Sequence, residues 1–101
     1  MFSKKVYELV KKIPKGKVST YKMVANKLGG RAYRAVGSAL RKNKDAEVPC
    51  HRIVKSNSNI GFYNKGIKNK IKLLRNEGVK IKDNKIVDFK KILYKFEGKD
   101  L

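Results

Sequence analysis

The sequence contains one cysteine and one histidine, and these two residues are neighbours, Cys50 and His51. A single cysteine excludes a disulfide within the chain, and one cysteine with one histidine is too few for a structural zinc site. Two interpretations of the sulfur atom remain. A lone cysteine is commonly a small apolar residue of the core, whereas a thiol beside a base can act as a nucleophile. The adjacent imidazole favours the nucleophile.

Basic residues outnumber acidic residues by 27 to 8, which gives the chain a formal net charge of +19. Such a field attracts polyanions, and nucleic acid is favoured over a membrane surface because no basic amphipathic helix with large aromatic anchors stands apart. Twenty-two of the basic residues are lysines. The composition of the genome or a hot habitat is therefore an alternative explanation of the charge.

Length and composition fit one soluble domain. The chain has 101 residues, of which 41% are hydrophobic and 35% are charged, and this balance is typical of a single folded domain over residues 1–101. No apolar run approaches the roughly 18 residues that cross a bilayer, and the first residues lack a secretory signal. We therefore expect a cytoplasmic monomer that does not contact a membrane.

The spacing of apolar residues predicts three short helices in the first half of the chain. They cover residues 2–13, 21–28 and 31 to about 41, and Ser19 or Thr20 can cap the second helix. Gly29 and Gly30 form a tight joint between the second and third helices, as in a helix-turn-helix motif. Many helical bundles contain such a joint, so the motif alone is weak evidence for DNA binding.

The third predicted helix has two different faces. At about 100° per residue, one face is apolar and is expected to lie on the core; it carries Ala32, Tyr33, Val36, Ala39 and Leu40. The opposite face is basic and carries Arg31, Arg34, Ser38 and Arg41, with the small residues Ala35 and Gly37 on the same helix. Small side chains permit close approach to DNA, but an ordinary solvated helix face fits the same pattern.

The second half of the chain combines extended and helical segments. Residues 48–54 are expected to be extended and interrupted by Pro49. A helix follows Gly66, with Ile67, Ile71 and Leu74 facing inward, lysines outward, and its end at Gly78. A hairpin around residues 83–84 and a last helical turn complete the chain. The fold class is mainly α, a winged-helix-like helix-turn-helix domain with a small amount of β structure.

Residues 48–54, with the sequence VPCHRIV, resemble the acceptor-site signature of the O6-alkylguanine-DNA alkyltransferase family. Residues 13–21 resemble the entry to the helix-turn-helix motif of that family, and residues 34–43 resemble its recognition helix and the hinge that follows. Residues 61–66 and 73–78 continue the match in the same order. The resemblance covers roughly residues 9 to 79, which correspond to the catalytic DNA-binding domain. The N-terminal domain that most members carry is expected to be absent.

The resemblance implies a DNA repair protein that uses no cofactor. Members bind double-stranded DNA, rotate an O6-alkylguanine out of the stack and transfer its alkyl group irreversibly to the cysteine that matches Cys50. His51 would take the thiol proton through a water molecule, and Glu77 would orient the imidazole, as in a hydrolytic triad. Tyr21 would donate a hydrogen bond to the purine, and Asn43 matches the hinge asparagine. From spacing alone, Tyr21 and His51 are packing residues and Glu77 belongs to a surface ion pair.

The resemblance also assigns residues to DNA binding and to the substrate pocket. Arg34 matches the arginine finger that fills the space of the flipped base. The helix with Ala35 and Ser38 would enter the minor groove, while Arg31 and Arg41 would contact phosphates. The substrate pocket would include Val48, Pro49, Ile53, Tyr63 and Asn64. Asn64 and Lys65 stand where relatives often have Ser-Gly or Arg-Trp, so the range of accepted alkyl groups does not follow from the resemblance.

A second function fits the same motifs. Alkyltransferase-like proteins sense the lesion without removing the alkyl group, and they typically replace the acceptor cysteine. The presence of Cys50, His51 and Glu77 together favours alkyl transfer over sensing. A basic DNA-packaging protein with an inert Cys50 is a third alternative, but it leaves the ordered series of motifs unexplained.

Overall fold

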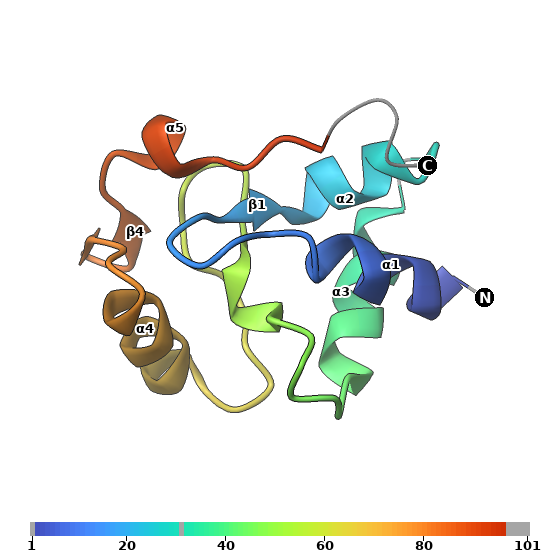
Figure 1. The fold of residues 1–101 in the computed structure, drawn as a ribbon, viewed down its shortest axis with the longest axis horizontal. Coiled ribbons are helices and arrows are strands. Elements are labelled where there is room, and N and C mark those ends of the chain that lie inside the picture. Colours follow the sequence, from blue (N-terminus) through green and yellow to red (C-terminus); the bar gives the residue numbers. More distant parts are fainter. Residues whose placement is uncertain (1, 31, 97–101) are drawn as a thin grey trace.

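The computed structural model describes residues 2–30 and 32–96. Its elements are α1 (Phe2–Val10), β1 (Ser19–Thr20), α2 (Tyr21–Lys27), α3 (Tyr33–Lys42), the 3-10 turn η1 (Cys50–Arg52), β2 (Ile53–Val54), α4 (Ile67–Asn76), β3 (Ile81–Lys82), β4 (Lys85–Ile86) and α5 (Phe89–Ile92). Figure 1 shows α1, α2 and α3 on one side, and α4 with the hairpin on the other. β1, η1 and β2 lie between the two sides. The mainly helical fold with little β structure is confirmed.

The first three helices surround one apolar cluster, which includes Val6, Val24, Val36 and Ile53. Thr20 is the cap of α2, because its side chain accepts a hydrogen bond from the amide of Met23 at 3.0 Å. α1 ends earlier than predicted, at Val10 rather than Ile13. The amides of Lys12 and Ile13 bond to carbonyls three residues back, so the chain continues as a tighter turn.

α3 begins later than the sequence predicted. Val36, Ala39 and Leu40 are buried as expected. Ala32 and Tyr33 were predicted to face the core, and both are exposed instead. Ala32 precedes the helix, so helical periodicity does not set the direction of its side chain. Tyr33 is the first helical residue, two turns from the buried Leu40 at the other end of this face. Arg31 lies outside the described residues.

Residues 48–54 also differ from the predicted extended segment. Cys50–Arg52 forms a 3-10 turn, closed by a hydrogen bond from the amide of Arg52 to the carbonyl of Pro49 at 2.9 Å. Only Ile53 and Val54 are extended, and they pair in parallel with Ser19 and Thr20 of β1. This short pairing ties the segment that carries Cys50 to the beginning of α2.

The second apolar cluster lies under α4 and the hairpin and contains Val18, Val54, Ile60, Leu74, Val79, Ile81 and Ile86. Two predictions for α4 are wrong: Ile67 is 47% exposed, and Lys70 is fully buried. Ile67 is the first residue of α4 and lies at the end of the inward face that is farthest from the buried Leu74. Lys70 precedes Leu74 by four residues and therefore shares its buried face.

The hairpin was predicted correctly. Asp83 and Asn84 connect β3 and β4 with positive φ angles of 51° and 61°, as a two-residue type I′ turn requires. Beyond α5 the chain returns to the first half, where the amide of Tyr94 bonds to the carbonyl of Val18 at 2.7 Å. Within the described residues, no helix is long and apolar enough to cross a membrane.

Candidate active site

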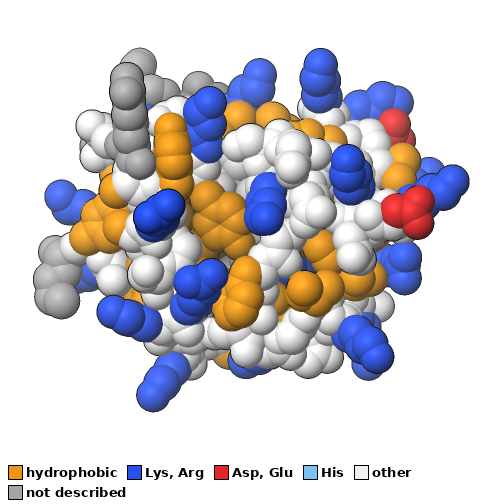
Figure 2. All heavy atoms as spheres, turned by 180° about the vertical axis from the view of Figure 1, so that it is seen from behind, with side chains coloured by type: hydrophobic (Ala, Val, Ile, Leu, Met, Phe, Trp, Pro, Cys, Tyr) orange, Lys and Arg blue, Asp and Glu red, His pale blue; other side chains and the backbone are white. Residues whose placement is uncertain are grey.

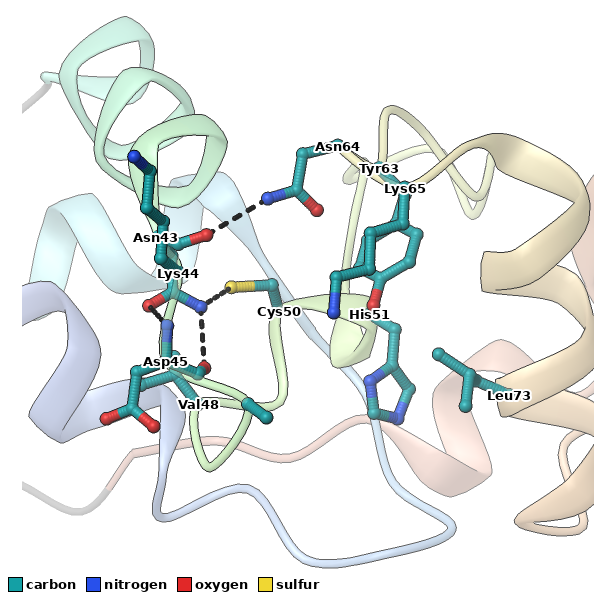
Figure 3. Close-up of a pocket in the computed structure, with 11 residues that line it drawn as sticks. Asn43, Lys44, Asp45, Val48, Cys50, His51, Tyr63, Asn64, Lys65 and Leu73 are labelled. Atoms are coloured by element: carbon teal, nitrogen blue, oxygen red, sulfur yellow. Dashed lines mark hydrogen bonds between the residues drawn. The ribbon is translucent and has the colours of Figure 1, made fainter.

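Cys50 lies at the start of η1, where the thiol meets the end of α3. The side chain is almost buried, with 8% of its surface exposed. Its sulfur atom accepts a hydrogen bond from the side-chain amide of Asn43 at 3.1 Å, and the thiol lies 4.0 Å from the carbonyl oxygen of Leu40. Figure 3 shows the thiol pointing toward Asn43. The sulfur is therefore held between the turn that carries it and the last turn of α3.

Asn43 is itself fixed by several hydrogen bonds. Its amide nitrogen also donates to the carbonyl of Asp45 at 3.0 Å, and its amide oxygen accepts from the amide of Asp45 at 3.1 Å. The side chain of Asn64 donates to the backbone carbonyl of Asn43 at 3.1 Å. The two bonds to Asp45 orient the Asn43 side chain so that its amide donates to the Cys50 sulfur.

His51 forms a network with Glu77 and Arg52, on the side of η1 away from Asn43. His51 Nε2 lies 2.9 Å from Glu77 Oε2, and Arg52 binds both carboxylate oxygens, at 3.0 and 2.7 Å. Burial raises the pKa of Glu77, but the hydrogen bonds from Arg52 and His51 outweigh it, so the pKa lies below its usual value. Arg52 also donates to the carbonyl of Ile13 at 2.8 Å, which anchors the network to the first half of the fold.

The protonation of His51 follows from this network. A carboxylate only accepts hydrogen bonds, so Nε2 of His51 carries the proton that it donates to Glu77. Burial lowers the pKa of His51 more than Glu77 raises it, and the imidazole is therefore neutral at pH 7. Among residues 2–30 and 32–96 no hydrogen bond engages its other nitrogen, Nδ1, whose lone pair can accept a proton. The ring is a proton acceptor whose protonated form the Glu77 carboxylate would stabilise.

Cys50 requires such an acceptor. Burial raises the pKa of the Cys50 thiol, against the opposing effects of the Asn43 hydrogen bond and of the positive charges on Lys70 and Lys65. The thiol is therefore protonated at neutral pH, and the groups around it stabilise the thiolate once a base removes the proton.

Cys50 and His51 line the same cavity, which has a volume of about 220 Å³ and which we name the thiol cavity (Figure 3). Its wall includes four further residues predicted for the site, namely Asn43, Val48, Tyr63 and Asn64. Tyr63 meets the His51 ring edge to face, with the ring centres 6.4 Å apart. Among the described residues no direct bond joins the thiol to the imidazole, so proton transfer between them requires a bridging group in this cavity.

Two residues predicted for the substrate pocket do not line the thiol cavity. Pro49 is half-buried, and Ile53 is completely buried. The amide of Ile53 donates to the carbonyl of Cys50, and the Ile53 carbonyl accepts from the side chain of Lys70 at 2.6 Å. The backbone of Ile53 is therefore engaged within the protein.

Four of the six residues predicted to contact DNA line a second cavity of about 520 Å³, which we name the helix cavity. Its lining includes Tyr21, Arg34, Ser38, Arg41 and Phe62. The Tyr21 hydroxyl donates to the carbonyl of Phe62 at 3.4 Å, and burial raises the pKa of Tyr21. The guanidinium of Arg41 lies 4.6 Å from the centre of the Phe62 ring.

The structure thus divides the predicted site into two groups. Tyr21 does not line the cavity of Cys50, and the neighbours Phe62 and Tyr63 line different cavities. Ala35 is exposed on α3 but does not line the helix cavity. The segment with Phe62 and Tyr63 therefore separates the two parts of the site.

Lys70 is a site residue that the sequence interpretation missed. Its buried ammonium nitrogen donates to the carbonyls of Ile53 and Phe62, at 2.6 and 2.8 Å. Burial lowers its pKa to about 7, a shift that a thiolate at Cys50 would oppose. Lys70 thereby joins β2 to the segment between the two cavities. Its place on the inner face of α4 was the available signal, but residue type argued against burial.

Solved structures of similar fold include a complex with damaged DNA and a DNA methyltransferase. The S. pombe protein Atl1, in complex with damaged DNA containing O6-carboxymethylguanine, superposes with a TM-score of 0.82 and 31% identity, covering 93% of this chain and 94% of Atl1. The O6-methylguanine-DNA methyltransferase of Pyrococcus kodakaraensis superposes with a TM-score of 0.71 and 45% identity, covering 77% of this chain and 46% of the archaeal protein.

Similar sequences and a family model give the same assignment. A methylated-DNA--protein-cysteine methyltransferase of Saccharolobus islandicus is 51% identical over 81 residues, which cover 79% of this chain and 52% of the relative. A bifunctional methyltransferase/endonuclease of Picrophilus torridus is 40% identical over 97 residues, 94% of this chain but only 32% of the relative. The chain thus spans a third to a half of these relatives. Residues 1–79 match the 6-O-methylguanine DNA methyltransferase, DNA binding domain, and the chain belongs to this family.

Proposed function

We propose that this chain removes the alkyl group from an O6-alkylguanine in double-stranded DNA by transferring it to the sulfur of Cys50. One observation carries the proposal: the thiol lies on the wall of a cavity together with a neutral imidazole whose second nitrogen is bound by a carboxylate. This is the arrangement that activates a nucleophilic cysteine. The methyltransferase names of the archaeal relatives support the same chemistry.

The reaction is a single displacement at the alkyl carbon. A bond forms between this carbon and Sγ of Cys50 as the bond to guanine O6 breaks, and its electron pair goes to O6. The thiol proton passes to Nδ1 of His51 through a bridging water molecule, and the departing guanine takes up a proton in turn. Because the product is a thioether, each chain reacts once.

The network behind the imidazole stabilises the charges that appear during this step. Glu77 lies 2.9 Å from His51 and favours the imidazolium, while the Asn43 amide donates to the sulfur at 3.1 Å and favours the thiolate. Tyr21 remains protonated because its pKa is raised. Its long bond to Phe62, at 3.4 Å, can be exchanged for one to the purine, which stabilises the guanine as a leaving group.

The exposed face of α3 is the DNA contact in this proposal. Arg34, Ala35, Ser38 and Arg41 are exposed there, with no acidic residue in the helix. Figure 2 shows one face of the molecule with many basic side chains around exposed apolar ones and acidic side chains near one edge. Arg34 enters the duplex and replaces the flipped guanine, since unstacking a base costs a few kcal/mol that new contacts must offset. Arg31 and Arg41 contact phosphates.

Lesion sensing without transfer is the second candidate, because Atl1 superposes over nearly its whole length. One experiment separates the two functions. The chain is incubated with a duplex that carries one O6-methylguanine, and its intact mass is measured. We expect a gain of one methylene, located on Cys50 by peptide mapping and absent in Cys50→Ala, which still binds the duplex. Tight binding of the lesion by the unchanged chain without any mass gain would establish sensing instead.

A further inference from the structure

Lys65 lines the thiol cavity and, although its side chain is exposed, places a positive charge at the mouth of that cavity. In Figure 3 its side chain descends beside Tyr63 and its amine points into the space between Cys50 and His51. The Lys65 charge is also close enough to the sulfur to favour the Cys50 thiolate. Lys65 therefore faces the position that the transferred group must occupy next to the sulfur.

The other charged residues of this wall are turned away or already neutralised. Figure 3 shows the amine of Lys44 and the carboxylate of Asp45 pointing out of the cavity. The Asp45 carboxylate accepts from the amide of Glu47 at 2.9 Å and lies 4.0 Å from the ammonium of Lys11. The Glu77 carboxylate is bound by Arg52 and His51. In the part of the chain that the structure describes, no acidic side chain is thus available to Lys65 within the cavity.

The Lys65 ammonium makes no hydrogen bond or ion pair among residues 2–30 and 32–96, whereas the cationic groups of Lys70 and Arg52 are bound to protein oxygens. An unpaired cation at the mouth of a small cavity attracts an anion of matching size. A neutral methyl group offers Lys65 no partner. A short alkyl group that ends in a carboxylate offers the Lys65 ammonium an ionic partner, one bond beyond the carbon that is transferred.

We infer that the thiol cavity prefers guanine adducts whose O6 substituent carries a negative charge, with the carboxymethyl group as the smallest example. The inference rests on the proposed transfer to Cys50. The bond changes are the same as for methyl: Sγ bonds to the methylene carbon, the bond from that carbon to O6 breaks with its electron pair going to O6, and the carboxylate is carried along unchanged. The product is S-carboxymethylcysteine.

The test compares two adducts of the same shape. Single-turnover rates are measured by intact mass with duplexes that carry O6-carboxymethylguanine or its neutral amide, O6-carbamoylmethylguanine. We expect the acid to react about fivefold faster, which corresponds to about 1 kcal/mol at 1.36 kcal/mol per tenfold change in rate. Lys65→Gln should lower the ratio of the acid rate to the amide rate about fivefold, because the intrinsic reactivities of the two adducts do not depend on this residue. Lys44→Gln, which removes an amine that points out of the cavity, should leave the ratio unchanged.

Using the ratio cancels general effects on DNA binding and on thiol activation, which are equal for the two duplexes. The same ratio, read from the Kd values of the Cys50→Ala variant, reports the charge preference without any transfer step. A chain that accepts methyl but shows equal rates and affinities for acid and amide would overturn this inference alone. A preference for the acid that survives Lys65→Gln would also overturn it. A chain that binds all the lesions and transfers none would overturn the proposed function, while the Kd ratio would still decide the charge preference.

Discussion

The two cavities of this protein are built in opposite ways. Around the thiol cavity, Asn43, His51 and Glu77 are each bound to another protein group by at least one hydrogen bond of 2.9 to 3.1 Å. Around the helix cavity, Arg34 and Ser38 are exposed and make no side-chain hydrogen bond among the described residues. The polar groups around the thiol cavity are ordered by the protein itself, whereas in the helix cavity Tyr21 and Arg41 contact Phe62 and leave Arg34 and Ser38 facing solvent.

This difference matches two different requirements, those of a chemical step and those of duplex recognition. Charge that develops during a chemical step is best stabilised by groups that are already in place, because no reorganisation is then needed. Recognition of a duplex instead requires side chains that can leave water and enter a groove. The segment with Phe62 and Tyr63, held from behind by Lys70, connects the two regions. Substitutions in the thiol cavity should change the rate of transfer, and those in the helix cavity should change access to the base.

The largest effect is expected from His51→Gln, which removes the base and retains a donor to Glu77. Because general-base catalysis contributes about 10²- to 10⁴-fold, the transfer rate at pH 7 should fall at least about a hundredfold. The rate of the variant should recover as the pH rises, since hydroxide then generates the thiolate without His51. The measurement is a single-turnover time course by intact mass. Affinity for the lesion duplex should stay at the value of the unchanged chain, and an equal loss of rate at every pH would contradict the base role.

Arg34→Ala, in the helix cavity, should impair access to the base in duplex DNA and leave the chemical step intact, unlike His51→Gln. If Arg34 offsets about 2 kcal/mol of the cost of base flipping, transfer from duplex DNA should fall about thirtyfold. Transfer from the free base O6-methylguanine should not change, because nothing is flipped. Lys68→Ala is the matched control, since it removes one exposed positive charge from α4. Equal losses with the duplex and with the free base would remove the distinction between the two cavities.

The pH dependence of the free energy of unfolding tests the role of Lys70, which connects the two regions. Its pKa is about 7 in the folded chain and about 10.4 in an unfolded one. Between these values the unfolded chain binds the extra proton, so the free energy of unfolding should rise with pH, by up to about 1.4 kcal/mol per pH unit. Urea denaturation from pH 7 to 8.5 should show this slope, reduced in Lys70→Met but retained in Lys68→Met. An unchanged slope in Lys70→Met would show that Lys70 is not the titrating group.

The sequence predicted those parts of the fold that depend on local signals. The Thr20 cap, the buried face of Val36 and Leu40, and the Asp83-Asn84 turn each follow from residues a few positions apart. The start of α3 was misplaced, and the 3-10 turn at Cys50–Arg52 was predicted as extended chain. In both places tertiary contacts select one of several local conformations that the sequence permits. Tyr33, which was predicted to face the core, lines the helix cavity instead.

The candidate site likewise combines residues that local sequence signals identify with residues that only long-range contacts bring together. The adjacent residues Cys50 and His51 indicated a nucleophile beside a base. No local pattern, however, pairs His51 with Glu77, which lies 26 residues further on. That pair was reached only through the resemblance to a family. The burial of Lys70 was missed because its bonds to Ile53 and Phe62 depend on where β2 and the segment after Ile60 pass α4. Long-range contacts of this kind are set by the whole core and have no signature in a single sequence.

The smallest effect is expected from Asn43→Ala, which removes the donor to the Cys50 sulfur. The pKa of the thiol should rise further, because the Asn43 hydrogen bond opposes the effect of burial. A scarcer thiolate slows transfer, but a more basic thiolate is a better nucleophile, with a Brønsted coefficient of about 0.4–0.5. The two changes cancel in part, so the transfer rate at pH 7 should fall only about fivefold although the lost bond is charge-assisted.

The pH profile of thiol alkylation by iodoacetamide separates this account from a loss of structure at the end of α3. In Asn43→Ala the midpoint of the profile should move to higher pH, and the limiting rate at high pH should be at least that of the unchanged chain. Asn64→Ala is the control, since Asn64 donates to the backbone of Asn43 and not to the sulfur; its midpoint should stay in place. A lower limiting rate in Asn43→Ala would mean that Asn43 positions the sulfur rather than stabilising its charge, and that order in the thiol cavity serves geometry more than electrostatics.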